Sequence, residues 1–385
     1  MTFRPMLKPL QRPAFTHRFA RTLSSTNRER AKMTFLHRDF PEGAMVETDA
    51  SGNLPEQSSE GVNQTILSGV DVNFVPWNPL IREAPDFQKD GFVFFDETEH
   101  YSDSAEIKEF ADMANSNADL EIGDIAKNHG KQYARAFQSK AAQLLHSREK
   151  VGGPAIMVPT QAMLRRASGP GSSGRYLPHV DFDYRQNTNE LVAPWWDKSW
   201  GKYILENPRV QETLATSGGP FLEGRGPLVD GLLSGSMKAT DILDDPAKSK
   251  DMFDLFSTTF NVCGLQTVWV ALNETPCYNN QLALCSWPSI DKRRDLKVYE
   301  IFGPGIKAIG LHPNEDQRWY APATLKFGQG VRFDAMKAPH VAVNREAEQA
   351  QQSEPRLSVE CRVLMLEVDW LNLSLARYDM ERCYE

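Results

Sequence analysis

Five residues have the types and the order of a metal site followed by an anion site. His179 and Asp181 stand two apart in PHVDFDY, and His340 follows in KAPHVAV. Two imidazoles and one carboxylate form a facial iron(II) site that leaves coordination positions open for other ligands. Arg356 and Ser358 come last, in PRLSVECRVLML. Because a guanidinium matches a carboxylate in shape and charge, the set favours a metal-dependent oxygenase that also binds a carboxylate.

His179 and Asp181 are expected to bind one metal from a single strand. Residues two apart on a strand point to the same face, so both side chains can reach one ion. His37 and Asp39 have the same spacing, but they lie in a polar stretch, and no distal histidine and anion clamp follow at a suitable interval. The metal is therefore assigned to His179, Asp181 and His340, which are also the predicted catalytic residues.

The run 356–368 alternates between apolar and polar residues, as a strand with two different faces does. The apolar face holds Leu357, Val359, Cys361, Val363 and Met365, and the polar face holds Arg356, Ser358, Glu360 and Arg362. A polar face this rich suits the inside of a barrel that holds a charged cosubstrate. An antiparallel strand with one solvated face would alternate in the same way, but it would leave the position of His340 unexplained.

Six segments occur in the order of the landmarks of one oxygenase family: RRASGPG, PHVDFDY, FNVCGLQTVWVALNETPCYNNQLALCSW, HPNEDQRWYAP, KAPHVAV and PRLSVECRVLM. Over residues 155 to 368 the chain resembles the fungal and bacterial hydroxylase/desaturase family that includes fungal gibberellin desaturase and a cephamycin methoxylation protein. The resemblance implies a dioxygenase that uses iron(II), 2-oxoglutarate and O2. Matched position by position, His179, Asp181 and His340 are the iron ligands. Arg356 matches the residue that binds the far carboxylate of 2-oxoglutarate, and Ser358 assists it.

The chain departs from the family pattern at three places. The Asn-Val-Trp-Arg-Pro of the family appears as NVCGL at 261–265, so its arginine is missing. Val180 replaces the usual threonine between the first two ligands, and 341–343 read Val-Ala-Val in place of Thr-Ala-Phe. None of these changes removes an iron ligand, so they indicate a divergent member with a different substrate.

The resemblance implies hydroxylation, desaturation or oxidative cyclisation of a small molecule of the secondary-metabolite type. Two other classes are open. One is a jelly-roll metal enzyme that does not use 2-oxoglutarate, in which Arg356 would be structural. The other is a catalytically silent small-molecule-binding protein of the same fold. The intact triad counts against the silent protein, and the Arg-x-Ser pair counts against the enzyme without the cosubstrate.

The hydrophobic pattern predicts a mainly β, α+β fold: a double-stranded β-helix, or jelly roll, with helices that buttress one side. Helices are expected at 104–117 and 124–148, and strands at 91–96, 154–165, 175–184, 256–272, 281–287, 297–302, 319–327, 331–334, 340–343 and 356–368. An insertion at about 190–252 contains Trp195, Trp196 and Trp200. Long insertions beside a site are often lids or substrate walls. The alternative is a helical layer that packs its own aromatic residues.

The start of the chain is basic, although the whole chain has a net charge of −8. Residues 1–33 hold eight Lys or Arg and one acid, which is typical of an organelle transit peptide. The alternatives are a disordered basic tail, or a true start at Met33. Pro5, Pro9 and Pro13 interrupt an amphipathic helix there. Residues 34–70 are predicted to be a polar linker, and 71–385 a single jelly-roll domain.

The composition narrows the partners and the compartment. An acidic body without a basic stripe argues against nucleic acid, which leaves a small-molecule substrate. No apolar run approaches the length of a membrane span, so none is expected. The five cysteines are odd in number and form no Cys-x-x-Cys, which favours a reducing, intracellular compartment. That compartment would be the cytoplasm, or a mitochondrion or other organelle if the basic start is a transit peptide. Nothing in the sequence specifies an oligomeric state.

Overall fold

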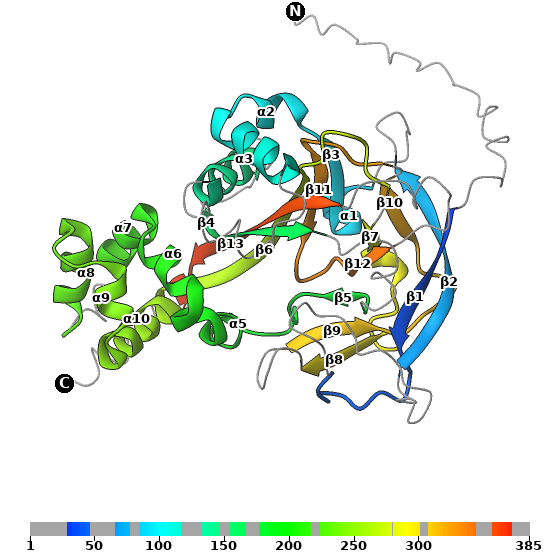
Figure 1. Ribbon diagram of the computed structural model, residues 1–385. Helices are drawn as coiled ribbons and strands as arrows, with labels where there is room; N and C mark the ends of the chain where they lie inside the picture. Colours follow the sequence, from blue (N-terminus) through cyan, green and yellow to red (C-terminus); the bar gives the residue numbers. More distant parts are fainter. Residues whose placement is uncertain are drawn as a thin grey trace, which may run out of the picture.

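The computed structural model describes residues 29–46, 66–77, 85–116, 133–145, 155–166, 177–217, 224–278, 280–300, 307–322, 324–343 and 356–371. These residues form a mixed α+β structure with two large β-sheets and a lobe of helices at one end (Figure 1). Within the described residues, no helix has the length and apolarity needed to cross a membrane.

One sheet has five strands, and every neighbouring pair in it is antiparallel. In spatial order the strands are β3 (Phe92–Asp96), β11 (Gln329–Asp334), β6 (Phe260–Ala271), β13 (Leu357–Val368) and β4 (Ile156–Arg166). The outer face of this sheet packs against α3 (Ala105–Ser116) and the helix at 133–145. The predicted helices at 104–117 and 124–148 therefore coincide with helices wherever the structure describes them.

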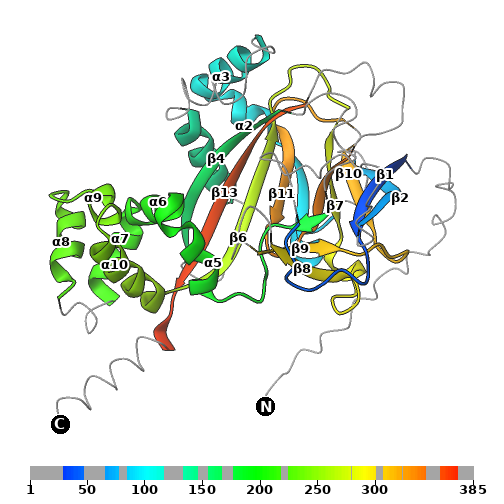
Figure 2. The ribbon, with the colours of Figure 1, turned by 60° about the horizontal axis from the view of Figure 1, so that its bottom comes forward.

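The other sheet has eight strands, and the pair β2–β10 is its parallel one. Their spatial order is β1 (Glu29–Leu36), β2 (Ile66–Trp77), β10 (Trp319–Pro322), β7 (Gln281–Cys285), β12 (His340–Val343), β5 (His179–Val180), β9 (Lys307–Leu311) and β8 (Leu296–Glu300). The sheet curls, so that β1 also packs against β9 and β12. Figure 2 shows the long strands β4, β13 and β6 beside the smaller strands of this sheet.

An apolar core joins the two sheets. Trp269 of β6 and Phe333 of β11 pack there with Leu282 and Leu284 of β7. On β13 the predicted alternation is confirmed as far as Val363, because Leu357, Val359, Cys361 and Val363 pack on the helix-covered face. Met365, the fifth residue of the predicted apolar face, is buried but does not belong to this cluster. The intervening polar side chains of β13 therefore point to the interior between the sheets.

The insertion forms a lobe of short helices. These are α5 (Thr188–Trp195), the π-helix η2 (Trp196–Trp200), α6 (Gly201–Leu205), α7 (Pro208–Ser217), α8 (Gly226–Ser234), α9 (Ala239–Leu243) and α10 (Pro246–Thr259). Trp196 and Trp200 are buried in the core of this lobe, at 3% and 1% exposure. For these two tryptophans, the structure therefore agrees with the second alternative, a helical layer that packs its own aromatic residues. The predicted strand at 256–272 begins later, at Phe260, because α10 continues to Thr259.

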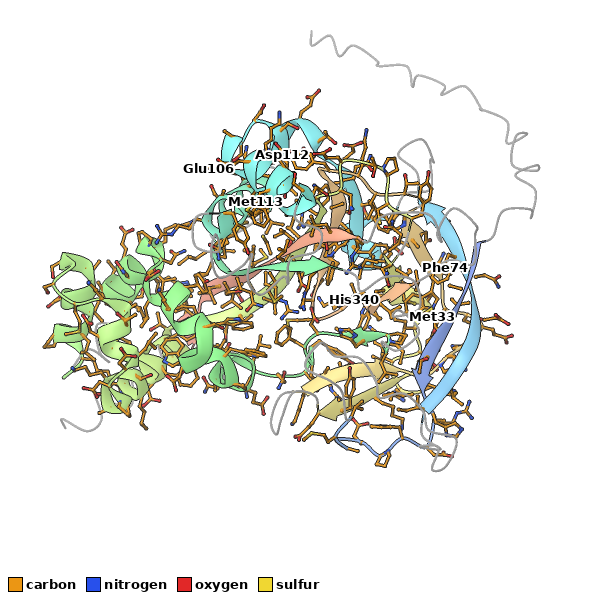
Figure 3. All side chains as sticks on the ribbon, viewed as in Figure 1. Met33, Phe74, Glu106, Asp112, Met113 and His340 are labelled. Atoms are coloured by element: carbon orange, nitrogen blue, oxygen red, sulfur yellow. The ribbon has the colours of Figure 1, made fainter. Side chains whose placement is uncertain are left out.

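The predicted segment boundaries at residues 33 and 70 are wrong, because residue 33 lies inside strand β1 and residue 70 lies inside strand β2. Met33 of β1 and Phe74 of β2 lie on neighbouring strands (Figure 3). Both are buried, with Phe35 of β1, in one apolar cluster. The every-second-residue pattern of Ala31, Met33 and Phe35 is a strand signal within a sequence that is otherwise basic and polar. Residues 29–33 are therefore part of the sheet. The transit-peptide prediction for 1–28 lies outside the described residues.

Three short helical segments complete the description: α1 (Phe87–Asp90), α2 (Thr98–Ser102) and the 3-10 helix η4 (Trp287–Ser289).

Candidate metal centre

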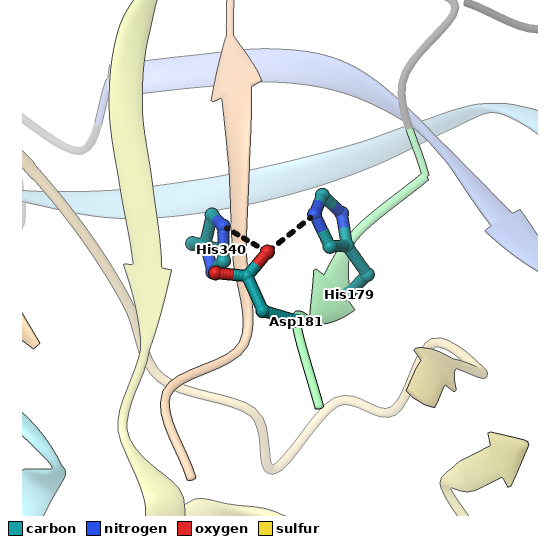
Figure 4. Close-up of side chains that lie close together, drawn as sticks. All are labelled: His179, Asp181 and His340. Atoms are coloured by element: carbon teal, nitrogen blue, oxygen red, sulfur yellow. Dashed lines mark ion pairs between the residues drawn. The ribbon is translucent and has the colours of Figure 1, made fainter. Parts of the chain in front are cut away.

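Three predicted ligands meet at the middle of the curled sheet. His179 of β5 and His340 of β12 occupy directly paired positions on antiparallel neighbours, and Asp181 follows β5 (Figure 4). One nitrogen or oxygen atom from each residue lies within 4.8 Å of the others. In the described part of the chain, this is the one such group of three His, Cys, Asp or Glu residues.

The main chain fixes both imidazole rings. Nδ1 of His179 lies 2.8 Å from the Leu177 carbonyl oxygen, and Nδ1 of His340 lies 3.0 Å from that of Ala338. A carbonyl oxygen only accepts hydrogen bonds, so each Nδ1 carries the proton and donates it. In the neutral ring, this leaves the lone pair on Nε2. Ligand histidines in metal sites are usually held by such a bond from the second nitrogen.

The two Nε2 atoms face one carboxylate oxygen. Oδ1 of Asp181 lies 3.5 Å from Nε2 of His179 and 3.7 Å from Nε2 of His340. Ligand atoms that each lie about 2.0–2.2 Å from a metal stand roughly 3–4 Å apart. The spacing of these three atoms therefore fits a shared metal ion.

The neighbouring backbone holds these ligands in place. The Phe182 N–H donates to the Ala335 carbonyl oxygen over 3.3 Å, which ties the chain after Asp181 to the loop that leads into β12. Gly310 of β9 pairs with His179 on the other side. A Cβ at Gly310 would overlap Leu36 Cδ1 and lie 3.2 Å from Tyr299 Cε1. A side chain at Gly310 would therefore displace Leu36 of β1, which packs directly against this position of β9.

The electrostatics favour an ionised carboxylate between histidines. Burial by itself would raise the pKa of Asp181, but Arg362 and the two histidines hold it well below its ordinary value. Burial lowers the pKa of His340 to about 4, so this ring is neutral at neutral pH. Burial is the largest single influence on His179 and acts to lower its pKa, but the hydrogen bond and charge of Asp181 together with the Leu177 carbonyl outweigh it, so the net shift of the pKa is upward. The site thus combines an anionic carboxylate with a neutral imidazole, both of which could bind a metal ion.

Arg362 comes to the site from the opposite sheet. Its Nη2 lies 3.2 Å from Oδ2 of Asp181, and its Nε donates to Oε1 of Glu360 over 2.9 Å. The guanidinium carbon also lies 5.4 Å from the centre of the Phe182 ring. The alternation of residues 356–368 predicted that Arg362 lies on the polar face of the strand, but nothing in the sequence predicted its contact with Asp181.

The predicted anion clamp is buried at the start of the same strand. Arg356 is 9% exposed and Ser358 is fully buried. Arg356 Nη1 donates to the Asn280 carbonyl oxygen, and its guanidinium carbon lies 5.2 Å from the centre of the Trp269 ring. The Ser358 hydroxyl donates to the Arg165 carbonyl oxygen over 3.5 Å. The structure therefore places both residues inside the protein, with Ser358 on the strand that also carries Arg362 and Arg356 directly before it.

The alternative pair His37 and Asp39 is unsuited to hold a metal. Their side chains are 36% and 84% exposed. His37 Nδ1 accepts a hydrogen bond from the Asp39 N–H over 3.2 Å, so that ring nitrogen is already engaged. Among the described residues, the pair has no third His, Cys, Asp or Glu to complete a site. The three residues predicted from their order in the sequence are therefore the same three that the structure brings together.

Comparisons with known proteins give matches in structure alone. No protein-family model matches the chain, and no curated protein matches it in sequence. Among solved structures, the chain is similar to an iron and alpha-ketoglutarate-dependent endoperoxidase, NvfI, at 14% identity and a TM-score of 0.48, over 88% of this chain and 98% of that chain. It is also similar to the non-heme alpha ketoglutarate dependent epimerase SnoN from nogalamycin biosynthesis, at 12% identity and a TM-score of 0.34, over 72% and 80% of the two chains.

Proposed function

We propose that this protein is an iron(II)- and 2-oxoglutarate-dependent oxygenase that acts on a small molecule. The convergence of two imidazole Nε2 atoms on one buried carboxylate oxygen carries this proposal. Two nitrogen ligands and one carboxylate, with open positions, are the donor set of non-haem iron(II) oxygenases. We assign His179, Asp181 and His340 as the ligands and the catalytic centre.

The strand pairing supports a double-stranded β-helix around this centre. Eight strands pair in a nested order: the first pairs with the last, the second with the second-to-last, and so on inward. The pairs are β4 with β13, β5 with β12, β6 with β11 and β7 with β10. Such nesting winds a long hairpin into a jelly roll, whose interior can hold a ligand.

The residues of the chain would position the reactants. Iron(II) with 2-oxoglutarate and O2 supplies the oxidising chemistry when bound. His179 and His340 are held by Leu177 and Ala338, which fixes the direction of both Nε2 lone pairs. Phe333 packs on His340 with ring centroids 4.6 Å apart and keeps water from one side of the site.

Arg356 is the proposed binding residue for the far carboxylate of 2-oxoglutarate, with Ser358 assisting. Arg356 is buried, at 9% exposure, and comes directly before β13, the strand from which Arg362 reaches Asp181. Its bond to Asn280 and its position over Trp269 would hold the guanidinium ready for a carboxylate. Its planar donors suit a bidentate contact.

The substrate is proposed to be a small molecule of the secondary-metabolite type, and the reaction a hydroxylation, desaturation or oxidative cyclisation. The motifs at 179–181, 340 and 356–362 support membership of the hydroxylase/desaturase family. The substitutions at 261–265 and 341–343 support a divergent substrate. The partners would then be small molecules, not nucleic acid.

Anaerobic titration with iron(II) and 2-oxoglutarate tests the proposal. The purified protein should develop a weak visible metal-to-ligand charge-transfer band when both are present, and His340→Ala should not. Binding of iron(II) without this band would favour a metal enzyme that does not use 2-oxoglutarate. Absence of iron binding in a folded protein would favour a catalytically silent small-molecule-binding protein.

A further inference from the structure

A line of four alternating charges runs from the protein surface to the metal site. Arg165 of β4 is 45% exposed, and its Nε lies 3.4 Å from Oε2 of Glu360. Glu360 accepts from Arg362 through its other oxygen, and Arg362 reaches Asp181. The last three side chains are only 9–13% exposed. Buried charges persist only when they are paired, so this arrangement needs an explanation beyond surface solvation.

The two carboxylate oxygens of Asp181 have different neighbours, because Arg362 contacts only one of them. Oδ1 faces both histidines, at 3.5 and 3.7 Å. Oδ2 lies 3.2 Å from the guanidinium of Arg362 but accepts no aligned hydrogen bond from the described residues. The contact is thus an ion pair that holds Oδ2 on the side away from the imidazoles.

We propose that Arg362 is a positioning residue that keeps Asp181 a one-oxygen ligand, so that the metal retains open positions for the cosubstrate and O2. This rests on the proposed metal function. Glu360 orients Arg362 through its Nε, and Phe182 supports the guanidinium from one face at 5.4 Å. Without this hold, the carboxylate could turn and present both oxygens to the ion.

Two effects of Arg362 oppose each other in a simple substitution. Removing the cation reduces its repulsion of a divalent ion, which strengthens metal binding. Releasing Asp181 weakens metal binding, because partners of metal ligands typically contribute about 10–100-fold in affinity. The double substitution Glu360→Gln with Arg362→Met removes one charge of each sign. Its net charge equals that of the parent protein, so it isolates the orientation of Asp181.

Cobalt(II) is a suitable probe, because its visible absorption reports the number of ligands. We expect the double variant to bind cobalt(II) about 10–100-fold more weakly than the parent, with a changed visible spectrum. Arg362→Lys in the unaltered background should keep most of the affinity. Arg165→Met is the matched control: it removes a cation from the other side of Glu360, does not touch Asp181, and should leave the spectrum unchanged.

Circular dichroism of the metal-free proteins shows whether each variant is folded. Replacement of the buried Glu360–Arg362 pair by neutral residues is often neutral or stabilising, and His179 and His340 remain beside the Asp181 carboxylate, so the double variant should fold. A folded double variant with the affinity and spectrum of the parent would overturn the role of Arg362 while leaving the metal site intact. A parent protein that binds no cobalt(II) would instead overturn the proposed metal function itself.

Discussion

His179 and His340 face each other across a single register pair of β5 and β12, with their ring centroids 4.6 Å apart. Each ring is held by a carbonyl oxygen two residues before it in the sequence, at Leu177 and Ala338. The two imidazole rings are therefore placed in the same way by two strands that are far apart in the chain. Because the two rings are held in equivalent ways, we expect substitution of either histidine to impair metal binding.

Substitution of either histidine should abolish tight metal binding. His179→Ala or His340→Ala removes one of three ligands, and the remaining pair cannot form a facial site. Isothermal titration with iron(II) under anaerobic conditions measures the loss. His37→Ala is the control, because His37 is exposed and bonds only within its own turn in the contacts described. Loss of binding in His37→Ala with retention in His179→Ala would refute the assignment.

Substitution of Arg356 should weaken the binding of 2-oxoglutarate but not of iron(II). Loss of a buried charged partner typically costs about 2–5 kcal/mol, which is tens- to thousands-fold in affinity. Arg356→Ala should therefore raise the 2-oxoglutarate concentration needed for the charge-transfer band. Arg356→Lys should recover part of the loss, since a point charge replaces the planar fork only in part. An unchanged 2-oxoglutarate requirement in Arg356→Ala would show that the clamp lies elsewhere.

Strand β1 should contribute to the stability of the whole protein. Phe35 is fully buried and meets Trp319 of β10 edge to face, with ring centroids 6.3 Å apart. Phe35→Ala should lower the free energy of unfolding by about 3–5 kcal/mol, as cavity-forming substitutions of this size do. Thermal and urea denaturation measure the effect. Arg38→Ala, at an exposed position just after the strand, should have little effect. Equal stability of the two variants would mean that β1 adds nothing to the core.

The cysteines should differ sharply in how fast they are alkylated in the native protein. Cys263 is exposed, whereas Cys277, Cys285 and Cys361 are buried. Burial raises the pKa of Cys285 to about 12. Because the thiolate is the reactive form, iodoacetamide should label the exposed Cys263 in the native protein, while Cys285 should stay unlabelled from pH 7 to pH 9 until the protein unfolds. Mass spectrometry of peptides from native and urea-treated protein follows each site. Rapid labelling of Cys285 in the native protein would contradict its burial.

Local sequence patterns were sufficient for the faces of β13 over 357–363, and they singled out the three residues that the structure brings together. The two-residue spacing of His179 and Asp181, and the alternation after Arg356, depend only on the period of a strand. The same period was present in Ala31, Met33 and Phe35, but the high basic charge around them favoured a tail, and the predicted boundary was wrong. A short apolar alternation within a charged stretch becomes a strand only when a partner such as β2 covers it.

Tertiary structure alone decided which distant groups meet. The pairing of His179 with His340, and the contact of Arg362 with Asp181, join residues from strands that no local period relates. The aromatic residues of the insertion gave no sequence signal for their partners, and Trp196 and Trp200 proved to be buried in a helical core. Sequence periodicity determines which way a side chain points. The side chain that it meets is set by long-range strand pairing and packing, where many weak contacts act together.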